Sequence, residues 1–297
     1  MKKFLEKHSI GVLLAPYVFL FTLFIIIPVL AAVALSFTYF NTIESPRFIG
    51  LANYISLLTN DKVFMQKVIP NTIIYASIVG IGGYLLSFFL AWSLSQLTKI
   101  PRTILAIIIY SPSMTGGVLL STVWGVIFNG DKSGYLNYLL LDMGIIDKPV
   151  LWLQSDKYLL AIMIIVTLWS SMGIGFLAIL AGIMNVNEEL YEAAYIDGVK
   201  NRFQEIIYVT IPSAKPQMLF GAVMAIVNTF TSSGVGVALS GSNPTPNYAG
   251  QLIVTHIEDY GFIRYEMGYA AAVSVVLLII IRLASVGANK LFGSADE

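Results

Sequence analysis

The sequence opens with an apolar segment that runs from Ile10 to about Phe40 without a single charged residue. About 20 apolar residues can cross the hydrocarbon core of a membrane as a helix, whereas the core of a signal peptide takes only about 7–15. No small-residue cleavage pattern follows this segment. We therefore expect a retained membrane span, and a chain in lipid must satisfy its backbone polar groups within helices.

The composition extends this expectation to the whole chain. Of the 297 residues, 57% are hydrophobic and 11% are charged, whereas a soluble domain carries roughly 25% charged residues. The net charge of zero argues against nucleic acid as a partner. The absence of cysteine excludes disulfides and thiolate metal sites, and the two histidines, His8 and His256, fall in different loops, which argues against a histidine-based metal site.

Apolar segments recur along the sequence between short polar stretches. We predict an all-α polytopic membrane protein in which residues 1–297 form one transmembrane domain with a polar loop at 185–216. Its six predicted spans are approximately 10–40, 71–97, 103–128, 158–184, 217–239 and 267–288. A short helix is also expected over Tyr135–Met143.

An even number of spans places both termini on the same side of the membrane, and the basic residues indicate which side. With both termini inside, the cytoplasmic segments hold 10 of the 17 basic residues in well under half of the extramembrane length. Positive charge concentrates on the cytoplasmic side of such proteins. We therefore expect cytoplasmic N and C termini. The ten residues are Lys2, Lys3, Lys7, Lys99, Arg102, Lys200, Arg202, Lys215, Arg282 and Lys290.

The polar loop at 185–216 has the pattern of two short helices with a break between them. Asn185 followed by Glu188 is typical of a helix start. Gly198 suits the left-handed position just past a helix end. Asn201 with Gln204 repeats the start signal, and Pro212 is expected to end the second helix. The second helix is predicted to share one apolar face among Phe203, Ile206, Ile207 and Thr210.

From the pattern alone this loop is either a docking surface or an amphipathic connector on the lipid surface. A resemblance adds to that reading. Glu192-Ala193-Ala194, Asp197-Gly198 and Ile211-Pro212 resemble the EAA loop of permease subunits in binding-protein-dependent ABC importers. In that family the loop forms a coupling helix that sits in a cleft of the ATPase subunit.

The resemblance implies a role for each residue of the motif. Glu192 would meet polar or basic groups of the cleft, while Ala193 and Ala194 would keep the helix surface small. Gly198 would form the elbow, and Pro212 would set where the fifth span starts. Pro212 stands fourteen residues after Gly198, one more than the family's spacing, and Ile211 replaces the usual Leu. The extra residue affects the register of the second helix.

Further matches extend the resemblance over most of the chain. They are typical of the larger permease in maltose-type sugar importers and comprise Ala15-Pro16, Pro28, Gly50-Leu51-Ala52-Asn53-Tyr54, Asn71-Thr72, Pro112, Gly134-Tyr135-Leu136-Asn137 and Met267-Gly268-Tyr269-Ala270. The resemblance implies a subunit of the bacterial cytoplasmic membrane, surrounded by lipid. Its partners would be a second homologous permease, two ATPase subunits and an extracytoplasmic solute-binding protein that delivers a sugar.

Motifs for catalysis are missing from the sequence. There is no G-x-x-x-x-G-K-[ST] phosphate loop, so we expect no cofactor on this chain, with ATP and Mg²⁺ on the partner ATPase. H-E-x-x-H and G-x-S-x-G are absent too, which makes a six-span intramembrane enzyme a poor alternative. No pair of acidic residues falls within the predicted spans, which disfavours ion-coupled secondary transport.

Uncharged polar and aromatic residues do occur at mid-depth in the predicted spans. Hydroxyl, amide and aromatic groups suit a neutral sugar, although Ser, Thr and Asn also bridge helices in membranes. The predicted substrate pathway comprises Tyr110, Trp169, Ser170, Ser171, Asn228, Thr229, Thr231 and Ser232, with Ser111, Ser113 and Ser233 beside them. A passive channel would explain the polar residues but not the polar loop. A phosphorylated cargo such as glycerol phosphate would need basic residues in the pathway, where only Arg282 comes near.

Overall fold

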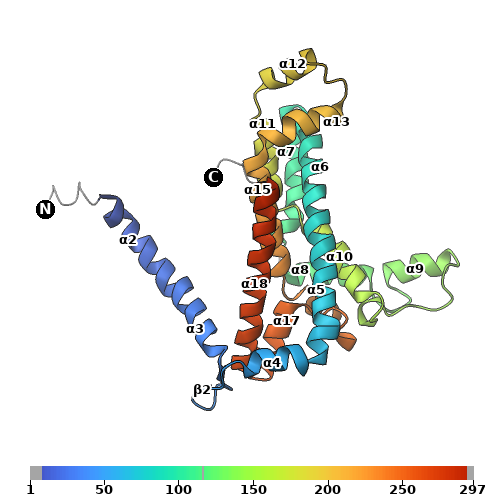
Figure 1. Cartoon of the computed structure of the whole chain (residues 1–297). Helices are drawn as coiled ribbons and strands as arrows, with labels where there is room; N and C mark the ends of the chain where they lie inside the picture. The colour runs from blue at the N-terminus through green and yellow to red at the C-terminus, as the bar shows by residue number, and fades with distance from the viewer. Residues whose placement is uncertain (1–8, 116, 293–297) are drawn as a thin grey trace. The chain divides into compact units, whose positions relative to one another are not determined.

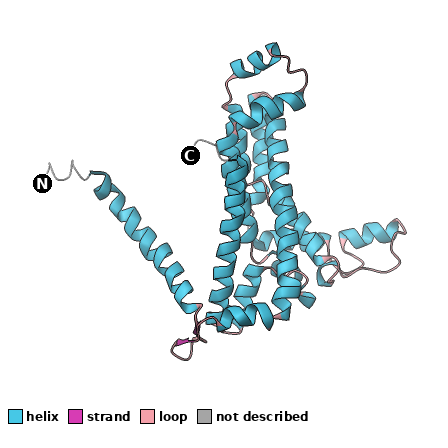
Figure 2. Ribbon diagram, viewed as in Figure 1, coloured by secondary structure: helices cyan, strands magenta, loops and turns pink. Residues whose placement is uncertain are grey.

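The computed structural model describes residues 9–115 and 117–292, and almost all of its regular structure is helical (Figure 2). The all-α class is thus confirmed. The only strands in the described part of the chain are β1 (Thr38–Tyr39) and β2 (Arg47–Phe48), which pair antiparallel. The predicted basic tail, with Lys2, Lys3, Lys7 and His8, lies outside the described residues.

Two compact units are distinguished, and each is described by itself. The first comprises residues 1–61 and 257–278, and the second comprises residues 62–256 and 279–297. The first unit contains β1 and β2 and the following helices: α2 (Ser9–Phe21), η1 (Thr22–Ile26), α3 (Ile27–Leu35), α4 (Ala52–Thr59), η8 (Asp259–Ile263) and the first part of α18 (Met267–Phe292).

Side-chain hydrogen bonds of two sequence motifs hold the first unit together. The amide of Asn53, on α4, donates to the carbonyls of Ser36 and Thr38, each at 2.9 Å. The hydroxyl of Tyr269, near the start of α18, donates to Asp61 at 2.7 Å. Both motifs therefore stabilise the fold of the first unit. A separate ion pair joins Arg264 to Asp259 at 2.6 Å in the same unit.

The second unit is a helical bundle (Figure 1). One long helix covers Phe64–Ser95, through η2 (Phe64–Val68), α5 (Ile69–Tyr75), η3 (Ala76–Gly82) and α6 (Gly83–Ser95). The remaining elements are α7 (Lys99–Tyr110), η4 (Ser111–Met114), α8 (Gly117–Ile127), α9 (Tyr135–Asp142), η5 (Trp152–Gln154), α10 (Leu159–Ser170), α11 (Ile174–Met184), α12 (Glu188–Ile196), α13 (Arg202–Glu205), η6 (Ile206–Thr210), α14 (Ile211–Ser213), α15 (Lys215–Phe230), α16 (Val235–Ser240), η7 (Pro246–Tyr248) and α17 (Ile253–Glu258), the last crossing into the first unit.

Two apolar clusters form the core of the bundle. The first surrounds Leu159 and Met163 on α10 and includes Tyr75 of the long helix. The second surrounds Phe176 and Ile179, where α11 packs against α6 and α15. Helices α6, α11 and α15 are thereby held side by side, and all three contribute residues to the polar cavity described below.

Three helices in the described part of the chain are long and apolar enough to cross a membrane. They cover 13–35, 64–95 and 267–290, and α10 with α11 would make a fourth, bent by 43° at their junction. The other two predicted spans, 103–128 and 217–239, are interrupted after Tyr110 and after Phe230. The total of six spans stays a prediction. The second span begins at Phe64, earlier than the predicted 71, and the predicted short helix appears as α9.

A π-helical turn precedes three of the prolines. Each of η1, η2 and η6 ends two residues before a proline, which is Pro28, Pro70 or Pro212. Proline lacks an N–H, and its ring clashes with the carbonyl four residues earlier in an α-helix. A wider turn with i→i+5 hydrogen bonds relieves this clash without ending the helix. Pro212 therefore does not terminate its helix as expected, because α14 continues through it to Ser213.

Candidate functional site

A polar cavity lies in the second unit where three helices are interrupted. The interruptions separate α7 from α8, α10 from α11, and α15 from α16. Residues beside all three line one cavity of about 390 Å³. In membrane proteins, irregular backbone at depth is tolerated where it is buried in protein or lines a cavity. Its polar lining is Tyr84, Ser87, Tyr110, Ser113, Thr167, Ser170, Ser171, Asn228 and Thr229.

Half of the eight hydroxyl groups in this cavity donate to a carbonyl of their own helix. Ser171 donates to the carbonyl of Leu168 at 2.8 Å, and Ser113 donates to that of Tyr110 at 2.7 Å. Thr229 likewise donates to the carbonyl of Ala225 at 2.6 Å. A hydroxyl whose proton is used in this way keeps its oxygen lone pairs as acceptors. The cavity therefore offers acceptor oxygens at fixed positions.

Asn228 and Tyr110 add groups that can both donate and accept. Neither side chain hydrogen-bonds to another described residue, and both line the cavity. Among the described lining residues there is no Asp, Glu, Lys, Arg or His. The cavity is thus polar without being charged, a combination that can bind hydroxyl-rich neutral molecules through hydrogen bonds.

Five of the eight predicted pathway residues line this cavity together: Tyr110, Ser170, Ser171, Asn228 and Thr229. The other three are directed elsewhere. Trp169 makes an edge contact with Trp124, with ring centroids 5.6 Å apart, and Thr231 donates to the carbonyl of Val227 at 2.7 Å. Ser232 lies 3.1 Å from the hydroxyl of Tyr75.

Sequence reasoning missed three of the polar lining residues: Tyr84, Ser87 and Thr167. Tyr84 and Ser87 lie on α6, away from the helix interruptions, and Thr167 lies on α10. That these three side chains line the same cavity as Asn228 becomes visible only once the helices are placed.

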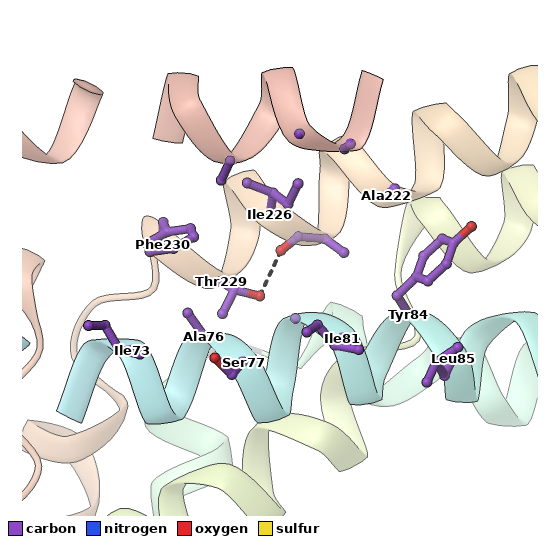
Figure 3. A pocket seen from close by; sticks show the side chains of 15 residues that line it. Ile73, Ala76, Ser77, Ile81, Tyr84, Leu85, Ala222, Ile226, Thr229 and Phe230 are labelled. Carbon is purple, nitrogen blue, oxygen red and sulfur yellow. Dashed lines mark hydrogen bonds between the residues drawn. The ribbon is translucent and has the colours of Figure 1, made fainter. Parts of the chain in front are cut away.

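A second cavity, an apolar groove, lies between the long helix, α15 and the end of α18 (Figure 3). It is the larger of the two, at about 570 Å³. Figure 3 shows Ala76 and Ile81 on one wall and Ile226 and Phe230 on the opposite wall. Thr229 belongs to both cavities, but its hydroxyl is bonded to its own helix. The groove suits alkyl chains or a helix, and its chemistry does not match a sugar.

The polar loop forms a helical hairpin at one end of the bundle (Figure 1). Its first helix, α12, is capped by Asn187, whose side chain accepts from the N–H of Glu189 at 3.1 Å. The expected cap at Asn185 is wrong, because Asn185 ends α11 and its N–H bonds to Ala181 and Gly182. Gly198 has a φ of +96°, which confirms the left-handed elbow.

The second helix of the hairpin starts as expected. Asn201 accepts from the N–H of Gln204 at 2.9 Å, and the Gln204 side chain accepts from the N–H of Lys200 at 2.9 Å. Its predicted face is wrong, however. Glu205 and Val209 are buried with Thr210, whereas Phe203 and Ile207 are exposed. The π turn η6 shifts the register, so the 3.6-residue period does not apply across it.

The outward face of α12 carries both motif residues and an apolar side chain. Glu192 and Ala193 are exposed, Ala194 is half-buried, and Asp197 and Gly198 at the elbow are exposed. Ile196, a large aliphatic side chain beside Asp197, is 87% exposed. Phe203, on the second helix of the hairpin, is 70% exposed. Pro212 is exposed as well, at the base of the hairpin.

The inward face of α12 is bonded to the second helix. The hydroxyl of Tyr195 donates to Glu205 at 2.7 Å, and Arg202 forms an ion pair with the same carboxylate at 2.8 Å. The hydroxyls of Tyr191 and Thr210 lie 3.2 Å apart. The hydrogen bond to Glu205 raises the pKa of Tyr195 above its ordinary value, and Glu205 also raises the pKa of Arg202.

Comparison with known proteins identifies the family to which this chain is related. The family described as "Binding-protein-dependent transport system inner membrane component" matches residues 11–289. The arabinooligosaccharides transport system permease protein AraP of Bacillus subtilis is 32% identical over 284 residues, covering 94% of this chain and 87% of that protein. The probable ABC transporter permease protein YesP of the same organism is 31% identical over 272 residues, covering 91% and 85%.

The fold is also found among solved structures. A crystal structure of a bacterial alginate ABC transporter, in complex with a periplasmic protein bound to an alginate pentasaccharide, contains a chain that matches with a TM-score of 0.80. The identity is 20%, and the match covers 98% of this chain and 96% of that one. This likeness establishes the fold. With the family match over nearly the whole sequence, the chain belongs to the inner membrane components of binding-protein-dependent transport systems.

Proposed function

We propose that this chain is the permease subunit of an ATP-driven importer that translocates a neutral sugar or oligosaccharide. The observation that carries the proposal is the uncharged polar cavity at the three helix interruptions. A sugar presents many hydroxyl donors, and the cavity offers fixed acceptor oxygens together with the amide of Asn228 and the phenol of Tyr110. The relative AraP is named for arabinooligosaccharides, which supports this class of substrate.

The hairpin is the proposed connection to the energy source. The exposed face of α12 presents Glu192, Ala193 and Ile196 without a covering element among the described residues. The Glu192-Ala193-Ala194 motif on this face resembles the loop that docks on the ATPase in related permeases. We assign an ATPase subunit as the partner that docks on this face. That subunit would hold ATP and Mg²⁺, and this chain itself would catalyse no reaction.

Alternating access follows from this arrangement. A binding protein on the extracytoplasmic side delivers the sugar, ATP binding closes two ATPase subunits, and the hairpin passes that movement to α15 through η6 and α14. The proposal includes six spans with both termini and the hairpin in the cytoplasm, and a second homologous permease across the pathway. The alginate importer, solved with its periplasmic sugar-bound protein, supports a binding protein as a partner.

A phosphorylated cargo is the second candidate within transport. Phosphate recognition generally uses Arg or Lys side chains or helix N-termini. The described lining of the polar cavity contains no basic residue, so we favour a neutral sugar.

The test is affinity purification of the tagged chain from its native membrane, followed by uptake measurements in proteoliposomes with the co-purified subunits. We expect a P-loop ATPase and a second permease in stoichiometric amount, and ATP-dependent uptake of a neutral sugar. Glu192→Lys should release the ATPase or stop uptake, while Glu44→Lys, an exposed charge reversal in the first unit, should not. Purification of the chain without an ATPase would overturn the proposal.

A further inference from the structure

The bonds inside the hairpin follow a spacing that an α-helix alone could not provide. Tyr191 and Tyr195 are four residues apart on α12, which places them on one face. Their partners, Thr210 and Glu205, are five residues apart. At about 100° per residue, two positions five apart on an α-helix point about 140° away from each other. Both partners could not then face α12.

The π turn removes this mismatch. Between Glu205 and Thr210 the chain forms η6, and the N–H of Ile211 bonds to the carbonyl of Ile206, five residues back. With i→i+5 hydrogen bonds, a residue five positions along lies where a residue four along lies in an α-helix. The hydroxyl of Thr210 accordingly reaches the carbonyl of Glu205 at 3.4 Å. Glu205 and Thr210 therefore present their side chains to the same helix.

Glu205 is the buried centre of this group. Its side chain is only 5% exposed, although it is charged and lies close to the end of the bundle. A buried carboxylate is stable only when its oxygens are hydrogen-bonded or paired. Here Tyr195 supplies one hydrogen bond from α12, and Arg202 supplies the ion pair from the first turn of the second helix. Glu205 therefore accepts bonds from both helices of the hairpin, from Tyr195 on α12 and from Arg202 on its own helix, on either side of the elbow at Gly198.

We propose that Tyr191, Tyr195, Glu205 and Thr210 form a hairpin brace that fixes the angle between α12 and the helix leading into α15, with Glu205 as its positioning residue. The proposal rests on the proposed function, because it assigns to the brace the transfer of movement from the docked helix to the membrane. Without the brace, α12 would turn about the Gly198 elbow, and closure of the ATPase would move α12 without moving α15.

The sequence provides sharp variants and a matched control. Tyr195→Phe removes only the hydroxyl, Glu205→Ala removes the acceptor, and Glu205→Gln keeps an acceptor while losing the charge. Tyr208 lies in the same π turn, is 68% exposed, and its hydroxyl makes no hydrogen bond to another described residue. Tyr208→Phe is therefore the same chemical change outside the brace.

The first measurement is the distance between α12 and the bundle in the full chain. The sequence has no cysteine, so the substitutions Ile196→Cys and Lys99→Cys would introduce the only two attachment sites for spin labels. Both positions are exposed. In lipid nanodiscs we expect one narrow distance distribution for the parent and for Tyr208→Phe, and a clearly broader one for Tyr195→Phe and Glu205→Ala. Equal widths in all four proteins would overturn the brace.

The second measurement is the number of sugar molecules taken up per ATP hydrolysed by the assembled transporter. Loss of one hydrogen bond lowers the equilibrium constant for the braced hairpin by about fivefold, so the uptake per ATP should fall in Tyr195→Phe, with normal amounts of bound ATPase. The uptake per ATP should fall less in Glu205→Gln than in Glu205→Ala. Combining Tyr195→Phe with Glu205→Ala should lower it no further than Glu205→Ala alone. A normal ratio in Tyr195→Phe, or an equal fall in Tyr208→Phe, would contradict the inference. Absent ATP-dependent uptake in the parent would count against the proposed function, while the distance measurement still decides the brace.

Discussion

Gly182 and Gln217 meet where α11 crosses the start of α15, and a side-chain carbon on Gly182 would lie 2.7 Å from Cβ of Gln217. The same crossing brings Gly175 to Gly221, where an added carbon would lie 3.4 Å from the Gly221 Cα. Small residues let helix backbones approach closely in lipid, where packing contributes much of the attraction between helices. This close crossing holds together two of the helices that form the polar cavity.

The first prediction concerns this crossing. Gly182→Ala should lower the stability of the folded chain by about 1–3 kcal/mol, because the contact is with a Cβ atom that cannot rotate away. Thermal unfolding in nanodiscs, followed by tryptophan fluorescence, measures the change. Gly125→Ala on α8 is the control, since nothing lies within 4 Å of an added carbon there. That variant should gain roughly 0.5–1 kcal/mol. Equal stability of the two variants would show that the helices do not cross this closely.

A second prediction separates residues inside the cavity from polar residues near it. Asn228→Ala removes an amide that lines the cavity, whereas Thr231→Ala removes a hydroxyl outside it. Loss of one hydrogen bond to the sugar predicts a rise of about 2- to 10-fold in the concentration for half-maximal uptake in Asn228→Ala. Thr231→Ala should remain near the parent value. The reverse order would move the pathway away from this cavity.

The elbow of the hairpin gives a third prediction. Gly198→Asp forces a side chain into a left-handed conformation, at a cost of about 1–2 kcal/mol. We expect it to weaken ATPase binding or to lower uptake, as measured by co-purification and transport. Gly144→Asp imposes the same kind of strain at a φ of +65° in the loop after α9, with nothing within 4 Å. Transport should survive that control, and a comparable defect in both variants would mean that strain alone is responsible.

A fourth prediction concerns the loop between α8 and α10. Asn137 is fully buried; its amide donates to three backbone carbonyls, and its oxygen accepts from the N–H groups of Val150 and Trp152. Asn137→Ala should destabilise the loop by about 2–3 kcal/mol, since several buried groups lose their partner. Limited proteolysis within residues 129–157 reads this out. Asn289→Ala, an exposed change on α18, should leave cleavage unchanged. Equal cleavage of both variants would contradict the prediction.

The sequence was sufficient for features that depend on one residue's own chemistry. Gly198 required a left-handed elbow, Asn201 capped the following helix, and Pro112 lies at the interruption after α7. The polar residues beside the interruptions were also found, because a hydroxyl or amide is conspicuous in an apolar span. Five of them line one cavity, although their assignment to a substrate pathway stays a prediction.

Features that depend on helical phase could not be predicted. The period of 3.6 residues grouped Ile207 with Thr210 on one face, but across the π turn Thr210 is buried with Glu205 and Val209 while Ile207 is exposed. Trp169 adjoins Ser170, yet it packs against Trp124 outside the cavity, because neighbouring residues on a helix point about 100° apart. The brace joins residues ten or more positions apart and required the three-dimensional structure.

The three interruptions around the polar cavity have a mechanical consequence. An unbroken helix resists bending along its whole length, so opening a pathway through a bundle of such helices would distort many hydrogen bonds together. In the proposed transport cycle the half-helices on either side of each interruption would tilt while their own hydrogen bonds stay intact. Opening would then use rotation about a few backbone torsions near Ser113, Gly173 and Gly234. The substrate would sit at the pivot, where the walls move least and the hydrogen-bonding groups keep their spacing.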